Sequence, residues 1–356
     1  MSDLPRYGLA MIVKNGADDL PRTLAAARPY IGYYVISDTG STDDTMAIIR
    51  RELKGIPGVL REDPFVDFGH NRSIVFAEIR NKCRWALLMD ADMAVEMDEE
   101  WEPDPALDAY MIEMGRYTPF SYRLPLLVRG DIAWRSVGAV HEYTWREDGL
   151  PYRSEPTDAV RVDMTAADRS SPEKFRWHLA MLMREWRRDR TNQRTAFYLA
   201  QTFRSLGKTA VARRWYLRRA GMAGYAEEAF YSAYQAALLA PDWPTRAVEL
   251  MAAWERRPGR LEPLYDLAAE LNRRDMHHAA YALASVGAPL PADSLFVSTW
   301  VWDWGVTFER SVAAYWVGRR DECRELCDRL LENPRVPTFV RAQVLVNRKY
   351  TTEEAA

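Results

Sequence analysis

The chain has 356 residues, 48% hydrophobic and 28% charged, which is the composition of a globular protein and not of a disordered one. The length is sufficient for two domains of ordinary size. The 48 basic and 51 acidic residues nearly balance, which argues against a large general nucleic-acid surface. There is no apolar run of about 18 residues and no apolar signal-peptide core, so we expect a cytoplasmic protein without a membrane span.

Short apolar segments alternate with amphipathic ones in the first part of the chain. Helical patterns cover residues 44–53 and 71–83, with apolar side chains repeating on one face. The apolar segments are each followed by polar residues or glycine, as buried parallel strands are. The strands predicted from these segments cover residues 9–13, 33–36, 85–89, 109–113, 124–128 and 137–145. Strand–helix alternation predicts a doubly wound, mostly parallel α/β sheet.

Strand patterns stop after about residue 170, and the chain continues as helix upon helix. Small residues recur at a fixed spacing: Ala200 is followed 68 residues later by Ala268, and Ala212 is followed 68 residues later by Ala280. This spacing is two periods of about 34 residues, the repeat length of tetratricopeptide (TPR) helix pairs. An irregular helical bundle is the alternative. We expect a sheet domain over residues 1–168 and a TPR-like helical domain over 169–356.

The segment between the two patterns is Ser170-Ser171-Pro172, where the composition changes and proline interrupts what precedes it. Cys323 and Cys327 lie four residues apart in a helical pattern and share a face. We expect them to pack in a core, since three scattered cysteines form neither a disulfide framework nor a metal knuckle.

The triplet Asp90-Ala91-Asp92 is the sharpest chemical signal in the sequence. It follows an apolar strand directly, so both carboxylates are expected at the carboxyl edge of the sheet, where open α/β folds bind ligands. Carboxylates suit a hard divalent cation, and such a cation can hold a diphosphate. The alternative is a solvated acidic turn, because several more acidic residues follow.

A second polar segment, Asp38-Thr39-Gly40-Ser41-Thr42-Asp43-Asp44, follows the second predicted strand. Gly40 permits a tight turn, and the Ser, Thr and Asp side chains can cap the next helix. Asp38 adds a carboxylate at the end of a strand, where it can accept a hydrogen bond from a base N–H. No Gly-x-Gly-x-x-Gly or P-loop is present, so ordinary dinucleotide binding and phosphoryl transfer lack their expected cradles.

Together these segments resemble the family 2 glycosyltransferases of GT-A fold. The resemblance covers roughly residues 8–150, and the order and spacing of the motifs match as well as their residues. A helical-repeat region behind such a domain is similar to a subgroup that includes bacterial peptide glycosyltransferases. The motifs are Ala10-Met11-Ile12-Val13-Lys14-Asn15, Asp38 to Thr45, Phe68-Gly69-His70-Asn71-Arg72 and Leu87 to Asp92.

The resemblance implies a nucleotide-sugar donor, most often a UDP-sugar, and an Mn²⁺ or Mg²⁺ ion. It places Asp38 against the base, Asp90 near the ribose and the metal, and Asp92 on the metal. The chain departs from the family at Gly16, where a glutamate is usual. The donor-binding residues that the resemblance implies are Val13, Lys14, Asn15, Asp38, Asn71, Arg72, Asp90 and Ala91.

Val140-His141-Glu142 also resembles a segment of this subgroup. His141, after a strand, could supply a third metal ligand beside Asp90 and Asp92. Glu142 could act as the general base, because inverting transfer needs a carboxylate to take the proton of the acceptor. The alternatives are a hydrogen-bonded histidine at the end of a strand and a salt-bridged surface glutamate.

The acceptor side is less defined. Trp134 and Arg135 precede this segment, and Trp134 could stack on a sugar or belong to the core. Lys174, Arg194 and Tyr198 fall in stretches reminiscent of the same subgroup and are candidate acceptor residues. Ten arginines gather between residues 184 and 219, which leaves an anionic acceptor or a nucleic-acid partner open, although the net charge does not favour one.

These features favour an inverting, metal-dependent hexosyltransferase that moves a sugar from a UDP-sugar to an acceptor, with a protein or peptide as first choice. A saccharide or a modified nucleic-acid base is an alternative acceptor. Another interpretation is a TPR-type binding or scaffold protein with an inactive transferase domain, since helical repeats form surfaces that hold peptides. A Rossmann-type methyltransferase would need a denser glycine-rich loop after residue 35.

Overall fold

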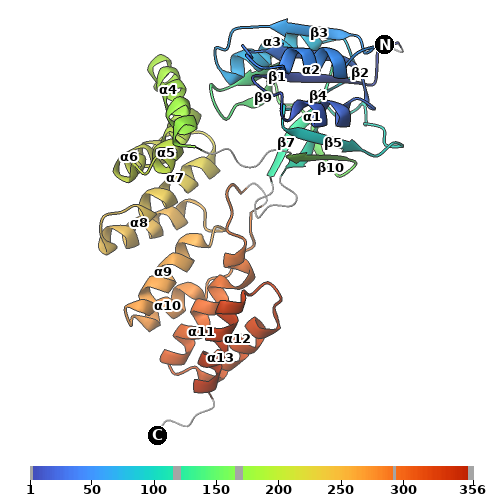
Figure 1. Ribbon diagram of the computed structural model, residues 1–356. Helices are drawn as coiled ribbons and strands as arrows, with labels where there is room; N and C mark the ends of the chain where they lie inside the picture. The colour runs from blue at the N-terminus through green and yellow to red at the C-terminus, as the bar shows by residue number, and fades with distance from the viewer. Residues whose placement is uncertain (1–2, 115–121, 165–170, 292–293, 352–356) are drawn as a thin grey trace. The chain divides into compact units, whose positions relative to one another are not determined.

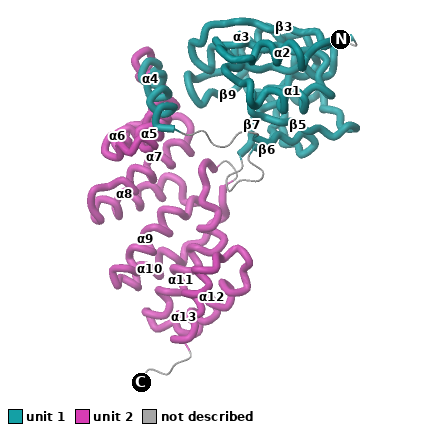
Figure 2. The backbone as a smooth tube through the Cα atoms, in the orientation of Figure 1, with its two compact units in different colours: residues 1–185 teal, residues 186–356 magenta. Residues whose placement is uncertain are grey.

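The computed structural model describes residues 3–114, 122–164, 171–291 and 294–351. The chain forms two compact units, Met1–Glu185 and Trp186–Ala356 (Figures 1 and 2). The boundary predicted at residues 168 and 169 falls in a stretch, 165–170, that lies outside the described residues. Within the described ranges, no helix is long and apolar enough to cross a membrane.

The first unit is an α/β domain, as predicted. Its main sheet has the order β10-β6-β7-β4-β1-β2-β3 and is mostly parallel, with β7 antiparallel to both of its neighbours. Two further sheets pair β5 with β11 and β8 with β9. The elements are β1 (Tyr7–Val13), α1 (Leu20–Ala27), β2 (Ile31–Asp38), α2 (Thr45–Glu52), β3 (Gly58–Glu62), α3 (Phe68–Ile79), β4 (Trp85–Leu88), β5 (Met93–Met97), β6 (Ala109–Met114), β7 (Tyr122–Arg129), β8 (Trp134–Val137), β9 (Tyr143–Arg146), β10 (Ser154–Thr157), β11 (Val160–Met164) and α4 (Pro172–Arg188).

Strands β1, β2 and β4 bring their carboxyl ends to one edge of the sheet. All seven residues of β1 are buried, which is typical of a central strand covered on both faces. Val13 at the end of β1 pairs in register with Asp38 at the end of β2. On the other side of β1, Ala10 pairs with Leu88, the last residue of β4. The segments after these strands therefore meet at the same edge, as the sequence predicted.

The continuous strand predicted over residues 137–145 is wrong. The structure forms a hairpin instead, with β8 and β9 antiparallel and a turn between them. The turn contains Gly138 (φ +114°) and His141 (φ +54°), both in the left-handed region where an extended strand cannot continue. Because His141 and Glu142 lie in this turn, the hairpin decides where both side chains point.

The hairpin is packed tightly against the first turns of α3. The backbone N–H of Gly69 donates to the carbonyl of Gly138 (3.1 Å), and that of Ser136 donates to Ser73 Oγ (3.0 Å). A Cβ on Gly69 would lie 2.6 Å from the Gly138 oxygen, so only glycine permits this approach. The contact sets Arg72, on α3, beside the hairpin turn.

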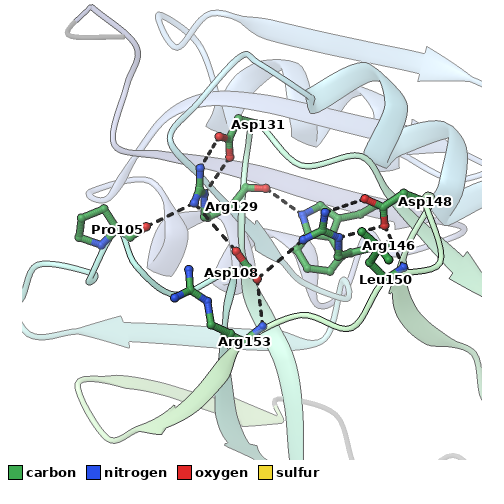
Figure 3. A network of polar contacts seen from close by, with 9 residues as sticks. Pro105, Asp108, Arg129, Asp131, Arg146, Asp148, Leu150 and Arg153 are labelled. Carbon is green, nitrogen blue, oxygen red and sulfur yellow. Dashed lines mark hydrogen bonds and ion pairs between the residues drawn. The ribbon is translucent and has the colours of Figure 1, made fainter.

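Charged side chains anchor the base of the same hairpin (Figure 3). The buried carboxylate of Asp108 accepts from the Arg153 backbone N–H (2.9 Å) and lies 3.9 Å from both Arg129 and Arg146. Arg129 at the end of β7 also bonds Asp131, with Nε 2.9 Å from the carboxylate. Arg146 at the end of β9 is thereby tied to the main sheet, which limits how far the hairpin can move.

The second unit is a stack of antiparallel helix pairs, which confirms the predicted helical-repeat architecture. The four alanines of the 34-residue spacing, Ala200, Ala212, Ala268 and Ala280, are all completely buried. The elements are α5 (Gln193–Ser205), α6 (Thr209–Ala220), α7 (Ala226–Leu238), α8 (Trp243–Arg256), α9 (Glu262–Arg273), α10 (His277–Ala284), the π-helical turn η1 (Val301–Gly305), α11 (Val306–Trp316), α12 (Arg320–Glu332) and α13 (Thr338–Tyr350).

The alanines leave room for large partners at the contacts between successive helices. Tyr216 of α6 is buried against Ala200 and Ala212 in one cluster. Cys323 and Cys327 of α12 are buried in another cluster with Leu330, so their predicted place in a core is confirmed. Small and aromatic side chains therefore pack together in these clusters, as the sequence spacing indicated.

Replacement of Leu87 by alanine tests the central part of the sheet. Leu87 is fully buried in β4 and faces Leu9 of β1 and Leu127 of β7. We expect Leu87→Ala to lower the free energy of unfolding of the first unit by about 2–5 kcal/mol in urea denaturation. Leu150→Ala, at a side chain that is 57% exposed, should change it by less than about 0.5 kcal/mol. Equal shifts for the two variants would contradict the assignment of β4 to the core.

Candidate functional site

The loops after β1 and β2 are joined by reciprocal hydrogen bonds. The Asn15 backbone N–H donates to Ser41 Oγ (2.8 Å), and the Thr42 backbone N–H donates to Asn15 Oδ1 (2.8 Å). Asn15 adopts φ +49°, a left-handed conformation that asparagine tolerates better than most residues. The backbone N–H of Gly16 donates to Thr45 Oγ1 (2.9 Å) in a buried contact. Most of this polar motif thus holds two loops together.

Asp43 completes this junction. Its carboxylate accepts hydrogen bonds from the Thr45 hydroxyl and from the backbone N–H groups of Thr45 and Ala17. These hydrogen bonds lower the pKa of Asp43, and the bond from the Thr45 hydroxyl has the largest effect.

The space around Gly16 is small, which agrees with glycine in place of the glutamate that is usual in the resembled family. A Cβ on Gly16 would lie 2.9 Å from Val13 Cγ2 and 3.3 Å from Leu20 Cγ, so this position has little room for a glutamate.

Asp38 is buried at the end of β2, with only 3% of its surface exposed. Its Oδ1 accepts from the backbone N–H groups of Gly40 (2.9 Å) and Ser41 (2.8 Å). Its Oδ2 is equally buried and has no hydrogen-bond partner among the described residues. Buried acceptors without a partner are rare and energetically unfavourable in folded proteins. The described residues include eight other buried side-chain atoms without a hydrogen-bond partner, and the Asp38 oxygen is the one that lies at the carboxyl edge of the sheet.

Arg72 joins two carboxylates from different elements. Its Nε donates to Glu142 Oε1 (2.6 Å) in the hairpin turn, and its Nη2 donates to Asp90 Oδ1 after β4. The side chains of Arg72 and Glu142 are 21% and 15% exposed. Burial disfavours the guanidinium charge, but the carboxylates of Asp90 and Glu142 outweigh it and raise the pKa of Arg72. Arg72 therefore stays charged and joins the side chains of Asp90 and Glu142 through charge-assisted hydrogen bonds.

A cavity of about 150 Å³ lies beside this ion-pair system. Arg72, Asp90 and Glu142 contribute its charged lining, and Tyr143 and Thr144 add hydroxyl groups. The rest of the lining is mostly apolar and comes from β1, β4, β7 and α3. The arrangement puts one cation and two anions next to a small space with apolar walls.

The predicted three-ligand metal site is not assembled in the part of the chain that the structure describes. No group of three or more His, Cys, Asp or Glu side chains is placed there to hold a metal ion. Asp90 and Asp92 both lie near Tyr122. Partial burial raises the pKa of Tyr122, and the negative charges of the two carboxylates raise it further. These two oxygen ligands suit a hard divalent cation, and the third predicted ligand, His141, lies in the hairpin turn before Glu142.

His141 contacts a residue of helix α4. Its ring makes an edge-to-face contact with the ring of His178 in α4 (centroids 5.7 Å). His178 is buried against Trp177 (5.6 Å), and its Nδ1 has no hydrogen-bond partner within the described ranges. Burial together with the charge of Lys174 lowers the pKa of His178. The predicted acceptor residue Lys174 is itself exposed on α4.

The other predicted donor residues differ in their availability. Lys14 and Asn15 are exposed at the sheet edge, whereas the Val13 side chain is buried. The Asn71 amide is engaged at both ends, since Oδ1 accepts from Val66 N–H (2.9 Å) and Nδ2 donates to the Pro64 carbonyl (3.1 Å). The Ala91 carbonyl accepts from the Thr23 hydroxyl (2.7 Å), which fixes the turn between the two aspartates.

The predicted acceptor residues are divided between the two units. Trp134 is buried and donates from Nε1 to the Arg129 carbonyl (2.8 Å), which favours the core alternative over sugar stacking. Arg135 is exposed on β8. Arg194 and Tyr198 belong to α5 of the second unit, where the Arg194 guanidinium lies over the Tyr198 ring (4.9 Å).

Two contributors to the site had no sequence signal of their own. Tyr122, at the start of β7, lies near Asp90 and Asp92, and a lone tyrosine before an apolar strand does not stand out. Ser73 fixes the hairpin against α3, but a serine inside a helical pattern is typical of a surface residue. Only the strand pairing and the hairpin bring these residues to the site.

Comparison with known proteins identifies partial likenesses to solved structures. No family model matches the chain, and no curated protein matches it. S. aureus TarS 1–349 in complex with UDP-GlcNAc gives a TM-score of 0.32 at 11% identity, over 79% of this chain and 91% of that chain. The C-terminal part of a TPR repeat-containing protein from Cytophaga hutchinsonii gives a TM-score of 0.36 at 11% identity, over 51% and 69%. A thermophilic TPR protein of Thermus thermophilus gives 0.31 at 13% identity, over 49% and 91%.

Replacement of Thr45 by valine tests the junction between the loops. The variant keeps the shape of the side chain but leaves the buried Gly16 N–H without an acceptor. We expect Thr45→Val to destabilise the first unit by about 1–3 kcal/mol in urea denaturation. Thr42→Val is the matched control, because Thr42 is exposed and its hydroxyl lies 3.4 Å from Asn15. A loss of stability no larger in Thr45→Val than in the control would refute the structural role.

Proposed function

We propose that the protein is an inverting glycosyltransferase that transfers a sugar, a hexose in the first place, from a UDP-sugar to an acceptor, with the transferase over residues 1–168. The observation that carries the proposal is the buried Oδ2 of Asp38 at the carboxyl edge of the sheet, which has no partner among the described residues. Uracil has an N–H group that can donate a hydrogen bond to this oxygen. The exposed Lys14 lies at the same edge and is available to contact the rest of the nucleotide. Asn15 would contribute through its side-chain NH₂ group, since its Oδ1 accepts from Thr42 N–H.

The diphosphate would lie toward Arg72, whose permanent charge can offset the negative charge that develops on the leaving group. Arg72 already bonds Asp90, so a diphosphate arriving there would share the guanidinium with that carboxylate. Asp90 and Asp92 would hold Mn²⁺ or Mg²⁺, and the ion would supply positive charge at the leaving group.

Glu142 is the proposed general base. The acceptor oxygen attacks the anomeric carbon, the bond from that carbon to the phosphate oxygen breaks, and the acceptor proton passes to the Glu142 carboxylate. UDP leaves with the bonding electron pair, and attack from the opposite face inverts the anomeric configuration. Arg72 orients Glu142 through the 2.6 Å ion pair, and Glu142 lines the cavity.

The acceptor is proposed to be a protein or peptide, since the chain carries a helical-repeat unit of the kind that forms extended binding surfaces. Saccharide and modified-base acceptors are the alternatives. A binding protein with an inactive first unit is the competing function. Release of UDP from a panel of UDP-sugars by the full chain, with Mn²⁺ or Mg²⁺ present, separates the two, because a binding protein would release none.

Asp38→Asn tests the base contact. The backbone N–H groups of Gly40 and Ser41 require an acceptor, so the amide oxygen should take the place of Oδ1 and the NH₂ group that of Oδ2. The NH₂ group, a hydrogen-bond donor, then faces the base in place of Oδ2, which is an acceptor. We expect UDP affinity to fall by roughly tenfold or more and CDP affinity to rise, because cytosine offers an acceptor where uracil offers N–H. Isothermal titration calorimetry measures both affinities.

Asp44→Asn is the matched control for this test, because it makes the same chemical change at an exposed position of the same motif. It should leave both affinities unchanged. An Asp38→Asn chain that binds UDP as tightly as the wild type would refute the proposed base contact.

Glu142→Gln tests the general base. The variant keeps the shape of the side chain and can still accept from Arg72, but it cannot take a proton. We expect kcat for sugar transfer to fall by roughly 10²–10⁴-fold while KM for the UDP-sugar changes little. Glu147→Gln, at an exposed position after the same hairpin, should leave both constants unchanged. A Glu142→Gln chain with full kcat would assign the proton transfer to another group.

A further inference from the structure

The described parts of the loop between α10 and η1, residues 285–291 and 294–300, lie on helices that come up to about 100 residues earlier in the chain. Phe296 in this loop contacts the ring of Tyr231 in α7 (centroids 4.9 Å) and the ring of Phe197 in α5 (6.1 Å). Gly259, before α9, is so close to the loop that a Cβ there would lie 2.8 Å from Pro291 Cγ. These residues therefore touch two successive helix pairs of the second unit and the turn before α9.

Two buried charged side chains bind the main chain of this loop. Glu227 Oε2 accepts from the Leu295 backbone N–H (2.8 Å), and Arg260 Nη1 donates to the Leu295 carbonyl (3.1 Å). One residue of the loop is thus held through both of its backbone groups. Neither hydrogen bond involves a loop side chain, so the same pair could hold one residue of any extended peptide.

The charged pair does not depend on the loop for its own neutralisation. Arg260 is completely buried, forms ion pairs with Glu227 and Glu262 (2.7 Å to the latter), and lies over the ring of Phe230 (4.6 Å). Glu227 Oε1 lies 3.1 Å from the guanidinium of Arg257. If the loop left, these charges would remain paired, so the binding groups are preorganised.

Phe296, in contrast, has a strained backbone and a partly exposed side chain. Phe296 has φ +50°, in the left-handed region that bulky residues rarely adopt, and its side chain is 52% exposed. Its place beside Tyr231 and Phe197 nevertheless provides two aromatic walls for a ring. A ring on a relaxed backbone would fit the same walls without the strain.

We propose that residues 295–296 are an internal occupant of a peptide-binding face of the second unit, and that an extended peptide with an aromatic residue displaces them. Glu227 and Arg260 take one backbone N–H and one carbonyl of the peptide, and Phe197 and Tyr231 take the aromatic side chain that follows. This inference rests on the second unit alone and holds whether or not the first unit transfers sugar.

A fluorescent peptide with the sequence of residues 294–299, Ser-Leu-Phe-Val-Ser-Thr, tests the proposal by anisotropy with the full chain. Phe296→Ala removes the side chain of the internal occupant, and Phe339→Ala, at a 75% exposed phenylalanine of α13, is the matched control. We expect Phe296→Ala to bind the peptide roughly tenfold more tightly than the wild type and the control, because the face is open more often. A peptide with alanine in place of phenylalanine should bind roughly tenfold more weakly.

Equal affinity of the wild type and Phe296→Ala, binding that ignores the aromatic residue of the peptide, or no binding by any chain would overturn the proposal. Circular dichroism checks that the variant is folded. If the variant is not folded, the proposal is tested by measuring hydrogen exchange of the wild-type chain with and without peptide. Excess peptide should then accelerate exchange at the Leu295 amide, and unchanged exchange at millimolar peptide would overturn the proposal.

Discussion

The ion pairs of Arg72 are the interaction on which the charged site of the first unit depends. The guanidinium bonds Asp90 after β4 and Glu142 in the hairpin turn, so one side chain connects the main sheet with a separate two-stranded sheet. Arg72 reaches both because Gly69, one helical turn earlier, lets α3 touch the hairpin backbone. If Arg72 were lost, two carboxylates would face one small cavity without the guanidinium that now joins them.

The polar side chains after β2 differ in whether their hydrogen-bonding groups have partners within the chain. Ser41, Thr42, Asp43 and Thr45 use their hydrogen-bonding capacity on the neighbouring loop. Asp38 stands among them, but one of its buried oxygens has no partner among the described residues. Most polar side chains of this motif therefore hold the loops after β1 and β2 together. The same contacts fix the position of the buried Asp38 carboxylate.

The second unit uses charge in a different way. Arg219 and Arg260 are completely buried, and each is neutralised by glutamates at helix ends, Glu228 for the first and Glu227 and Glu262 for the second. The arginines that gather after residue 184 are therefore partly internal. Arg218 also lies over the rings of Trp186 and Trp215 (both 5.4 Å). Arg219 is the buried member of this set, whereas Arg184, Arg187, Arg188 and Arg190 are exposed to solvent.

Both architectures could be predicted from the sequence, because each depends on local periodicity. Alternating apolar segments specify the strands around β1, and alanines such as Ala200 specify the spacing of the helix pairs. Asp38 could also be singled out in this way, because the carboxyl ends of parallel strands meet at one edge whatever the details. The folded chain was needed to establish that His141 turns toward His178, and that Leu295 lies on Glu227. Those outcomes rest on backbone turns and on contacts between residues far apart in the chain, which leave no periodic trace in the sequence.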